Sequence, residues 1–377
     1  MLAPKEHSPL STRLRAVCVA AALAPLTLIA ACSSSSSPSS SPSASTSSSP
    51  ASGIVSLSET GSTLMFPLFG AWQTAYNKTV TNVNITTAGT GSGTGIADAA
   101  AGVVTMGGSD AYLSSAEMAQ NHNLLNIPLA VSAAMISYNL PGVKANLKFN
   151  GTVLAKIYSG KITTWNDPAI KALNPGVALP STKIVTLHRS DSSGTTFIFV
   201  SYLSAQDPTD WPVGQVGTTV SWPSAPGALA ELGNGGMVSG CAATKGCIAY
   251  IGTSYLTQTT AAHLGEGELA NKAGKFELPT PASIQAALAS FSGSTPANET
   301  QSLINTSAPT GYGIINYEYV IVNKKQSSAA VASALKAFLN WTLTTGSTAT
   351  FLAPVNFQPL PASVKALSQT QISSISG

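Results

Sequence analysis

The sequence predicts an α/β fold, because short apolar segments alternate with alanine-rich ones along most of the chain. Several short segments are apolar throughout, as strands are in a sheet that is covered on both faces. The roughly 325 residues after the N-terminal region can bury a large core and suggest about two domains. We expect strands at 83–87, 124–128, 133–139, 183–188, 248–251 and 314–323, and helices at 66–77, 95–101, 153–159, 196–203, 283–290 and 329–344.

The first 31 residues have the pattern of an export signal, with three basic residues before an apolar stretch over 16–30. Small residues stand directly before Cys32, which is similar to a bacterial lipobox. A membrane-spanning helix is the alternative, but about 15 apolar residues fall short of the roughly 20 that a bilayer requires. We therefore expect a lipoprotein signal peptide at 1–31, an acyl anchor such as palmitate on Cys32, and a flexible Ser/Pro-rich tether at 32–52.

The charge composition excludes nucleic acid as a partner. Only 9% of the residues are charged, against about 25% in an average domain. Without the four charged residues of the leader, the 18 basic and 15 acidic residues fall to 15 and 14. The mature chain is nearly neutral and has no basic stripe for nucleic acid, so any anion site must be local.

Two cysteines remain beyond the lipobox, Cys241 and Cys247, six residues apart. In an exported chain such a pair can close a short loop as a disulfide. A zinc site or free thiols are the alternatives, but the sequence has neither a second cysteine pair nor a nearby histidine to complete four zinc ligands. We therefore expect a structural disulfide, and no metal or other cofactor.

Three loops rich in Ser, Thr and Gly each precede a predicted helix. They are Gly61-Ser62-Thr63-Leu64, the glycine-rich run at 89–95, and Ser193-Gly194-Thr195. The unpaired N–H groups and the positive dipole end of a helix start can hold an anion. Each loop alone can also be an ordinary N-cap, because Ser and Thr are favoured at that position.

The third loop follows Arg189, the single arginine after the first 31 residues. A guanidinium group offers a planar fork of donors that matches an oxyanion. The alternative is a surface arginine in a Ser-rich turn. The coincidence of three helix-starting loops with this arginine favours an anion site.

Other motifs do not point to nucleotide binding or catalysis. The glycine run at 89–95 fits no G-x-G-x-x-G register, and the chain contains neither a P-loop motif nor a G-x-S-x-G elbow. The histidines of the mature chain, His122, His188 and His263, are dispersed. His188 could act as a general base beside Arg189, but a structural role at a strand end is the simpler interpretation.

Asp110, in Gly108-Ser109-Asp110-Ala111, is informative because a carboxylate normally repels an anion. A turn or a helix cap is the alternative interpretation. An acceptor is useful if the ligand carries a proton, and phosphate near neutral pH still does, whereas sulfate does not. A buried carboxylate facing a sulfate oxygen would add repulsion to desolvation, so Asp110 could separate these two anions.

Five segments of the chain occur in the order found in a known family. They are Glu59-Thr60-Gly61-Ser62-Thr63-Leu64, Gly91-Ser92-Gly93, Gly108-Ser109-Asp110-Ala111, Gly-Lys-Ile-Thr-Thr-Trp-Asn-Asp-Pro at 160–168, and Arg189-Ser190-Asp191-Ser192-Ser193-Gly194-Thr195. Together they make residues 53–377 resemble the PstS-type phosphate-binding proteins, and the chain looks like their actinobacterial lipoprotein branch. These proteins are the substrate-binding components of the phosphate-specific ABC importer.

The resemblance implies a two-lobed type II periplasmic-binding-protein fold of the Venus flytrap kind. It places two interdomain crossings near 129–132 and 312–316. Lobe I would comprise 53–130 and 313–377, and lobe II would comprise 131–312. The ligand would then bridge the two lobes and stabilise the closed state.

The resemblance also implies a set of phosphate ligands. In it Asp110 accepts the proton of phosphate, Arg189 is a bidentate donor, Asp191 orients the arginine, and Ser62 has a supporting role. One departure is Ser192, where the family often has glycine. The implied phosphate-binding residues are Thr63, Leu64, Ser92, Asp110, Arg189, Ser193, Gly194 and Thr195.

We therefore expect a non-enzymatic protein that captures inorganic phosphate and delivers it to the permease subunits of an ABC importer. It would be a monomer on the outer face of the cytoplasmic membrane, held through Cys32, without a nucleic-acid partner. The alternative is a secreted phosphate-handling enzyme, a phosphomonoesterase with Ser193 or Thr195 as nucleophile. The sequence offers that alternative neither a metal-ligand cluster nor an evident base.

Overall fold

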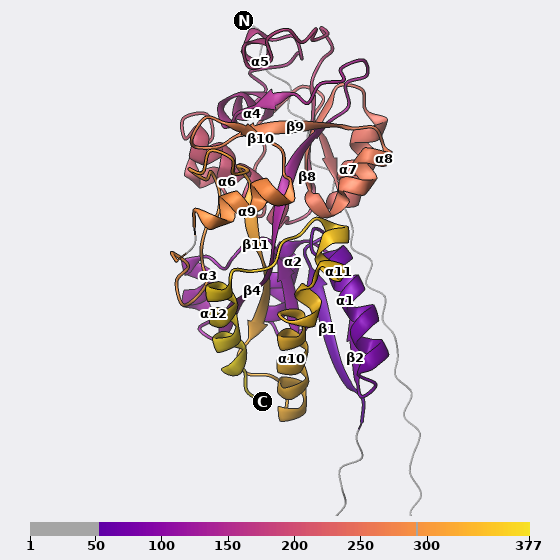
Figure 1. The fold of residues 1–377 in the computed structure, drawn as a ribbon, viewed down its shortest axis with the longest axis vertical. Coiled ribbons are helices and arrows are strands. Elements are labelled where there is room, and N and C mark those ends of the chain that lie inside the picture. The colour runs from indigo at the N-terminus through magenta and orange to yellow at the C-terminus, as the bar shows by residue number, and fades with distance from the viewer. Residues whose placement is uncertain (1–52, 292) are drawn as a thin grey trace, which may run out of the picture. The chain divides into compact units, whose positions relative to one another are not determined.

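The computed structural model describes residues 53–291 and 293–377, so the signal peptide and tether expected at 1–52, with Cys32, lie outside the described residues. Within these ranges the strands are β1 (Val55–Gly61), β2 (Val83–Thr86), β3 (Met106–Ser109), β4 (Leu124–Tyr138), β5 (Lys148–Phe149), β6 (Val185–Arg189), β7 (Leu229–Glu231), β8 (Cys247–Gly252), β9 (Gly265–Ala270), β10 (Phe276–Glu277) and β11 (Ile315–Asn323). They form a mixed sheet in the order β2-β1-β3-β11-β4-β8-β6-β7, and β9 connects β4 with β5 and β10. Figure 1 labels β1, β2, β4, β8, β9, β10 and β11. The predicted α/β class is confirmed.

A helix forms at each of the six places where the sequence predicts one, with bounds that differ by a few residues. The described helices are α1 (Phe66–Thr79), α2 (Ser92–Ala100), α3 (Ser115–Gln120), α4 (Gly151–Tyr158), α5 (Pro168–Leu173), α6 (Gly194–Gln206), α7 (Gly233–Ala243), α8 (Leu256–Ala261), α9 (Pro281–Ala289), α10 (Ala329–Thr342), α11 (Ala349–Leu352) and α12 (Ala362–Ser373). Among residues 53–291 and 293–377, none of the helices has both the length and the apolar character needed to cross a membrane.

The longest strand, β4, joins two parts of the sheet. Its residues 124–133 pair with β11, and its residues 134–138 pair with β8, both antiparallel. The sequence predicts two separate strands here, which is wrong, because the chain stays extended through Pro128. A proline has no N–H for the ladder, and it is tolerated where the register with β11 shifts between Glu318 and Tyr319.

The two strands β1 and β3 escape prediction from sequence although they lie inside the sheet. Strand β3 contains Gly107 and Gly108, and glycine is a poor strand former. Packing requires glycine at position 107, since a Cβ atom there would lie 2.1 Å from the carbonyl oxygen of Gly95 in α2. The strand therefore forms because its neighbours approach closely, which local sequence does not reveal.

Two clusters of buried apolar side chains pack against the sheet. One of them includes Leu57 of β1, Trp72 of α1 and Phe338 of α10. The other includes Trp165, which follows α4, and Tyr250 of β8. The apolar side chains of α1 that face the first cluster explain its helical pattern, because they recur at positions 68, 69, 72 and 76.

The predicted disulfide is present between Cys241, near the end of α7, and Cys247, at the start of β8. It closes the turn between these two elements. Gly246 in this turn has a φ of +84°, and a Cβ atom there would lie 2.3 Å from the carbonyl oxygen of Lys183. The disulfide and the glycine therefore both serve the geometry of this turn.

Candidate anion-binding site

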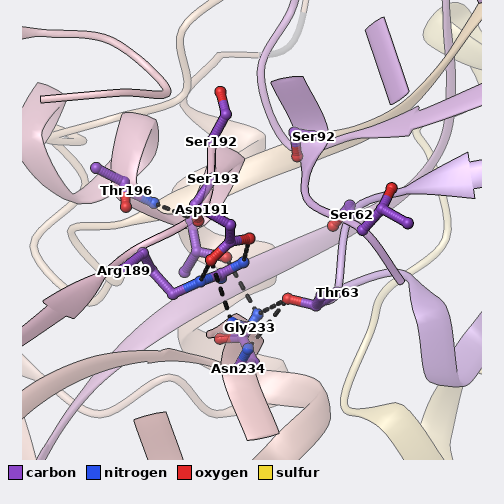
Figure 2. Close-up of polar contacts among 12 residues, drawn as sticks. Ser62, Thr63, Ser92, Arg189, Asp191, Ser192, Ser193, Thr196, Gly233 and Asn234 are labelled. Atoms are coloured by element: carbon purple, nitrogen blue, oxygen red, sulfur yellow. Dashed lines mark hydrogen bonds and ion pairs between the residues drawn. The ribbon is translucent and has the colours of Figure 1, made fainter. Parts of the chain in front are cut away.

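The polar residues singled out in the sequence gather where strands of the sheet end and helices begin. Strand β1 ends before Ser62 and Thr63, strand β3 ends before Asp110, and strand β6 ends at Arg189. Helices α2, α6 and α7 start beside them, as Figure 2 shows for several of these side chains. The starts of α2, α6 and α7 therefore lie at one place, and a helix start can supply N–H donors to an anion.

Arg189 is buried, with only 5% of its surface exposed. Its Nε donates to Asp191 Oδ1 at 2.7 Å, and its Nη2 donates to Asp191 Oδ2 (Figure 2). The third nitrogen, Nη1, is buried and has no hydrogen-bond partner within the described residues. A buried charged donor without an acceptor is costly, so Nη1 is suited to bind an anion.

Asp191 holds the arginine in place from one side. Burial alone raises the pKa of Asp191, but the hydrogen bonds and charge of Arg189 outweigh it, and the pKa lies below its ordinary value. The carboxylate is therefore ionised, and its Oδ1 also accepts the N–H of Gly233 at 3.1 Å. The expected orienting contact between these two side chains is present in the structure.

Backbone N–H groups at two helix starts are also unpaired. Gly194 and Thr195 open α6, and Ser92 opens α2. Within the described residues, no protein acceptor takes the N–H of Ser92, Gly194 or Thr195. All three residues are buried, and buried N–H groups are normally paired, so these donors are available to a ligand. Ser193 is the N-cap of α6, and its Oγ accepts the N–H of Thr196 at 3.1 Å.

Asp110 lies among hydroxyl groups and is 1% exposed. Ser62 Oγ donates to Asp110 Oδ1, and Thr195 Oγ1 donates to Asp110 Oδ2 at 2.9 Å. The backbone N–H of Asp110 donates to Ser92 Oγ at 3.2 Å. Burial raises the pKa of Asp110, while the two hydroxyl donors and the charge of Arg189 favour its ionised form.

The start of α6 approaches Ser92 and Asp110 closely. A Cβ atom on Gly194 would lie 2.5 Å from Ser92 Oγ and 2.7 Å from Asp110 Cβ. Only glycine fits such a contact without a shift of its neighbours. The loop that contains Arg189 and the loop that contains Ser92 are joined further by Gly93 N–H, which donates to the carbonyl of Ser192 at 3.0 Å.

Ser192 is the position where the resemblance often has glycine. Its φ is not positive, so serine adopts this backbone without strain. Its Oγ forms a hydrogen bond of 2.9 Å with Thr218 Oγ1. The departure in sequence therefore has no consequence for the conformation of the loop.

Leu64 and His188 have other contacts. The N–H of Leu64 donates to Ser62 Oγ at 3.1 Å, so this N–H is paired within its own loop. His188 stacks on Trp222 with 5.0 Å between ring centroids, and its Nδ1 contacts the carbonyl of Arg189. These contacts favour the structural interpretation of His188 over a general base.

Sequence reasoning misses Asn234, in the first turn of α7. The side chain is fully buried, and its Nδ2 donates to Thr63 Oγ1 at 2.9 Å (Figure 2). The same Nδ2 donates to Thr195 Oγ1 at 3.3 Å. Its Oδ1 accepts the N–H of Gly252 at 2.8 Å. Asn234 thus connects two predicted site residues, and the only signal in the sequence is the glycine-rich run around it at 233–236.

Residues 39–345 match the family model of the PBP superfamily domain. The chain is 32% identical over 312 residues to phosphate-binding protein PstS of Pasteurella multocida, which covers 82% of this chain and 87% of the relative. It is 31% identical over 344 residues to phosphate-binding protein PstS 3 of Mycobacterium leprae, which covers 86% of this chain and 90% of the relative. Because these identities are alike, an actinobacterial branch stays a prediction.

Solved structures share the fold. The phosphate-binding protein of Stenotrophomonas maltophilia aligns with a TM-score of 0.64 and 20% identity over 84% of this chain and 93% of that chain. The high affinity periplasmic phosphate-binding protein PfluDING, bound with phosphate, aligns with a TM-score of 0.66 and 23% identity over 84% and 93%. The fold is thus that of type II periplasmic-binding proteins. With a family model over most of its length and relatives above 30% identity, this chain belongs to the PBP superfamily and, within it, to the PstS family of phosphate-binding proteins.

Proposed function

We propose that this protein binds inorganic phosphate outside the cytoplasm and delivers it to an ABC importer. The observation that carries the proposal is the buried Nη1 of Arg189, which has no partner within the described residues, beside the unpaired N–H groups of Gly194 and Thr195. An oxyanion would satisfy all of these donors at once. The family supplies the identity of the anion, because the relatives are named for binding phosphate.

The charge balance of the site supports binding through hydrogen bonds rather than through net positive charge. Arg189 is paired with the ionised Asp191, so its charge is largely compensated before a ligand arrives. The remaining donors are neutral N–H and hydroxyl groups of Thr63, Ser92 and the loop 193–195. These residues, with the N–H of Leu64 released from Ser62, form the phosphate ligand set that we propose.

Asp110 supplies selectivity in this proposal. Its carboxylate already accepts two hydroxyl protons, from Ser62 and Thr195, which indicates an acceptor rather than a donor. A phosphate that keeps one proton can donate to it, whereas sulfate has no proton and would leave two anionic oxygens in contact. The site would therefore take phosphate and reject sulfate, although the two anions have almost the same shape.

We further propose that two lobes close on the ligand, lobe I at 53–130 and 313–377 and lobe II at 131–312. The division of β4 between two sets of partner strands supports a crossing near 129–132, and the start of β11 supports another near 312–316. Thr63, Ser92 and Asp110 would then belong to lobe I and the loop after Arg189 to lobe II. Closure around a bridging anion would give a permease a single state to recognise.

The cellular setting follows from the relatives and from the N-terminal sequence. A Clostridium perfringens protein with the same fold, aligned with a TM-score of 0.57, is described as a phosphate ABC transporter substrate-binding protein with bound phosphate. We propose the same partner, the permease subunits of such an importer, for a monomer held on the outer face of the cytoplasmic membrane by acylation of Cys32.

The role is binding rather than catalysis, as the names of the relatives indicate. The environment of Ser193 agrees with this role, because its Oγ accepts a helix N–H and His188 stacks on Trp222. Neither contact activates a nucleophile. The phosphomonoesterase alternative gains no support.

Calorimetry of the purified mature protein tests the proposal directly. Phosphate should bind with a stoichiometry of about one, sulfate should fail to compete in large excess, and arsenate should compete because it copies the shape and protonation of phosphate. Absence of phosphate binding would refute the proposed function. Equal affinity for phosphate and sulfate would refute the role of Asp110 while leaving the anion site in place.

A further inference from the structure

A second carboxyl group, that of Glu318, lies beside that of Asp110. Glu318 belongs to β11 and is fully buried, with its backbone in register with Ala130 of β4. Ser132 Oγ donates to its Oε1. Its other oxygen, Oε2, is buried and receives no N–H or O–H donor within the described residues.

Glu318 and Asp110 act on each other directly. The two side chains are close enough for a hydrogen bond between their carboxyl groups, and each shifts the pKa of the other. Two carboxylates that share a buried site do not both ionise, because repulsion and desolvation act in the same direction. One of the two carboxyl groups should therefore hold a proton.

The surroundings decide which group holds that proton. Asp110 receives hydroxyl donors from Ser62 and Thr195 and lies in the field of Arg189, all of which stabilise its charge. Glu318 receives the hydroxyl of Ser132 and the side-chain amide of Asn316, and the charged group that acts on it is Asp110 itself. Burial raises the pKa of Glu318 well above its ordinary value, and the charge of Asp110 raises it further.

We propose that Glu318 is a neutral carboxylic acid that donates a hydrogen bond from Oε2 to the carboxylate of Asp110, and that this bond makes Asp110 an obligate acceptor. Glu318 is thus a positioning residue for anion selectivity, which acts through Asp110 without touching the ligand. If Asp110 held the proton instead, it could donate to sulfate, and the discrimination would disappear. This inference rests on the proposed function, because its consequence is measured as phosphate binding.

Two substitutions separate the possible states of Glu318. Glu318→Gln keeps the size and supplies an NH₂ donor in place of the acid proton, so phosphate affinity and the phosphate-to-sulfate ratio should stay within about threefold of wild type at about pH 7. Glu318→Leu removes the donor, so phosphate affinity should fall about 10- to 100-fold and sulfate should be rejected less strongly. Calorimetry with phosphate, and competition by sulfate, measures both.

The pH profile gives a readout that a merely structural role would not change. Between about pH 8 and 10 phosphate keeps one proton, so changes in affinity report on the protein. Wild-type affinity should weaken as Glu318 loses its proton, because two carboxylates then face the anion, whereas the Glu318→Gln profile should stay flatter. The affinity of Glu318→Gln at about pH 7 keeps the inference testable even if Glu318→Leu does not fold.

Glu299→Gln is the matched control. Glu299 is also fully buried, and its pKa is raised to about 8 by burial, but it bonds with Ser368 and Gln371. This variant should bind phosphate like wild type at every pH. If Glu318→Gln tightens phosphate binding more than about tenfold, Glu318 is ionised and the inference is wrong.

The inference is also wrong if Glu318→Leu, shown to be folded by thermal unfolding, matches wild type in affinity and selectivity. A wild-type protein that does not bind phosphate at all would be a different result. It would refute the proposed function, and with it the inference. A wild type that binds phosphate, but more than about tenfold more weakly than Glu318→Gln at about pH 7, refutes the inference alone.

Discussion

Replacement of Arg189 by alanine should weaken phosphate binding more than replacement of any lysine. The side chain is buried, its Nε and Nη2 are fixed by Asp191, and its Nη1 is the charged donor without a protein partner. Arg189→Ala removes the donor to the ligand and at the same time leaves the ionised Asp191 without its cation. Both effects act against an incoming anion.

The expected magnitude follows from this geometry. Truncation of one partner of a buried charge pair costs about 2–5 kcal/mol in binding. That range corresponds to about 30-fold to several thousand-fold in affinity. Arg189→Lys keeps the charge but loses the planar fork that holds Asp191, so its loss should lie between those of wild type and alanine.

Titration calorimetry with phosphate measures the effect, and thermal unfolding without phosphate shows whether each variant is folded. Lys161→Ala is the control, because Lys161 forms an ion pair with Asp210 and 57% of its side chain is exposed. That variant should bind phosphate like wild type. A loss of tenfold or less in a folded Arg189→Ala protein would show that the arginine lies outside the site.

Four further results are expected. Asp110→Asn should retain weakened phosphate binding and reject sulfate less strongly in competition calorimetry, and an unchanged ratio would make Asp110 a structural cap. Gly194→Ala should cost about 1–3 kcal/mol, or about 5- to 150-fold in phosphate affinity, because its Cβ would lie 2.5 Å from Ser92 Oγ, whereas Gly70→Ala has nothing within 4 Å and should have no effect. Burial raises the pKa of Glu59 from 4.5 to about 8, so the contribution of Glu59 to the free energy of unfolding is complete below pH 4.5 and is lost as the pH rises to about 8. In urea unfolding, stability should therefore fall less over this pH range in Glu59→Gln than in wild type. An equal fall in the two proteins would contradict this prediction. Cys32→Ala should release the protein from membranes in fractionation, and undiminished association would indicate another tether.

The parts of the fold that the sequence predicts are those with a local signal. Helix α1 is recognisable because its apolar residues recur at helical spacing, and strand β11 because it is apolar along most of its length. Strand β3 gives no such signal, since two of its residues are glycines and Gly107 is needed where α2 approaches. The sequence predicts two strands in place of β4, because the register shift that accommodates Pro128 depends on the partner strand β11.

The site shows the same division. Arg189 and the loop after it are visible in sequence, because the single arginine of the mature chain precedes one of three helix-starting loops rich in Ser, Thr and Gly. Asn234 and Glu318 are not, because their roles come from contacts with residues 171 and 186 positions away in the chain, Thr63 and Ser132. An asparagine in a glycine-rich run and a glutamate in a strand have many possible roles until the sheet brings them to Thr63 and Asp110.

The small net charge of the proposed site has a physical explanation. A cluster of lysines and arginines would attract phosphate and sulfate alike, because Coulomb attraction does not distinguish anions of similar size and charge. The site instead compensates its one arginine with Asp191 and adds a buried carboxylate, Asp110, at the cost of repulsion. That cost is recovered only by a ligand that carries a proton. Selectivity therefore requires little net positive charge at the site. In our proposal, Asp110 can exclude sulfate only while Glu318 holds the proton.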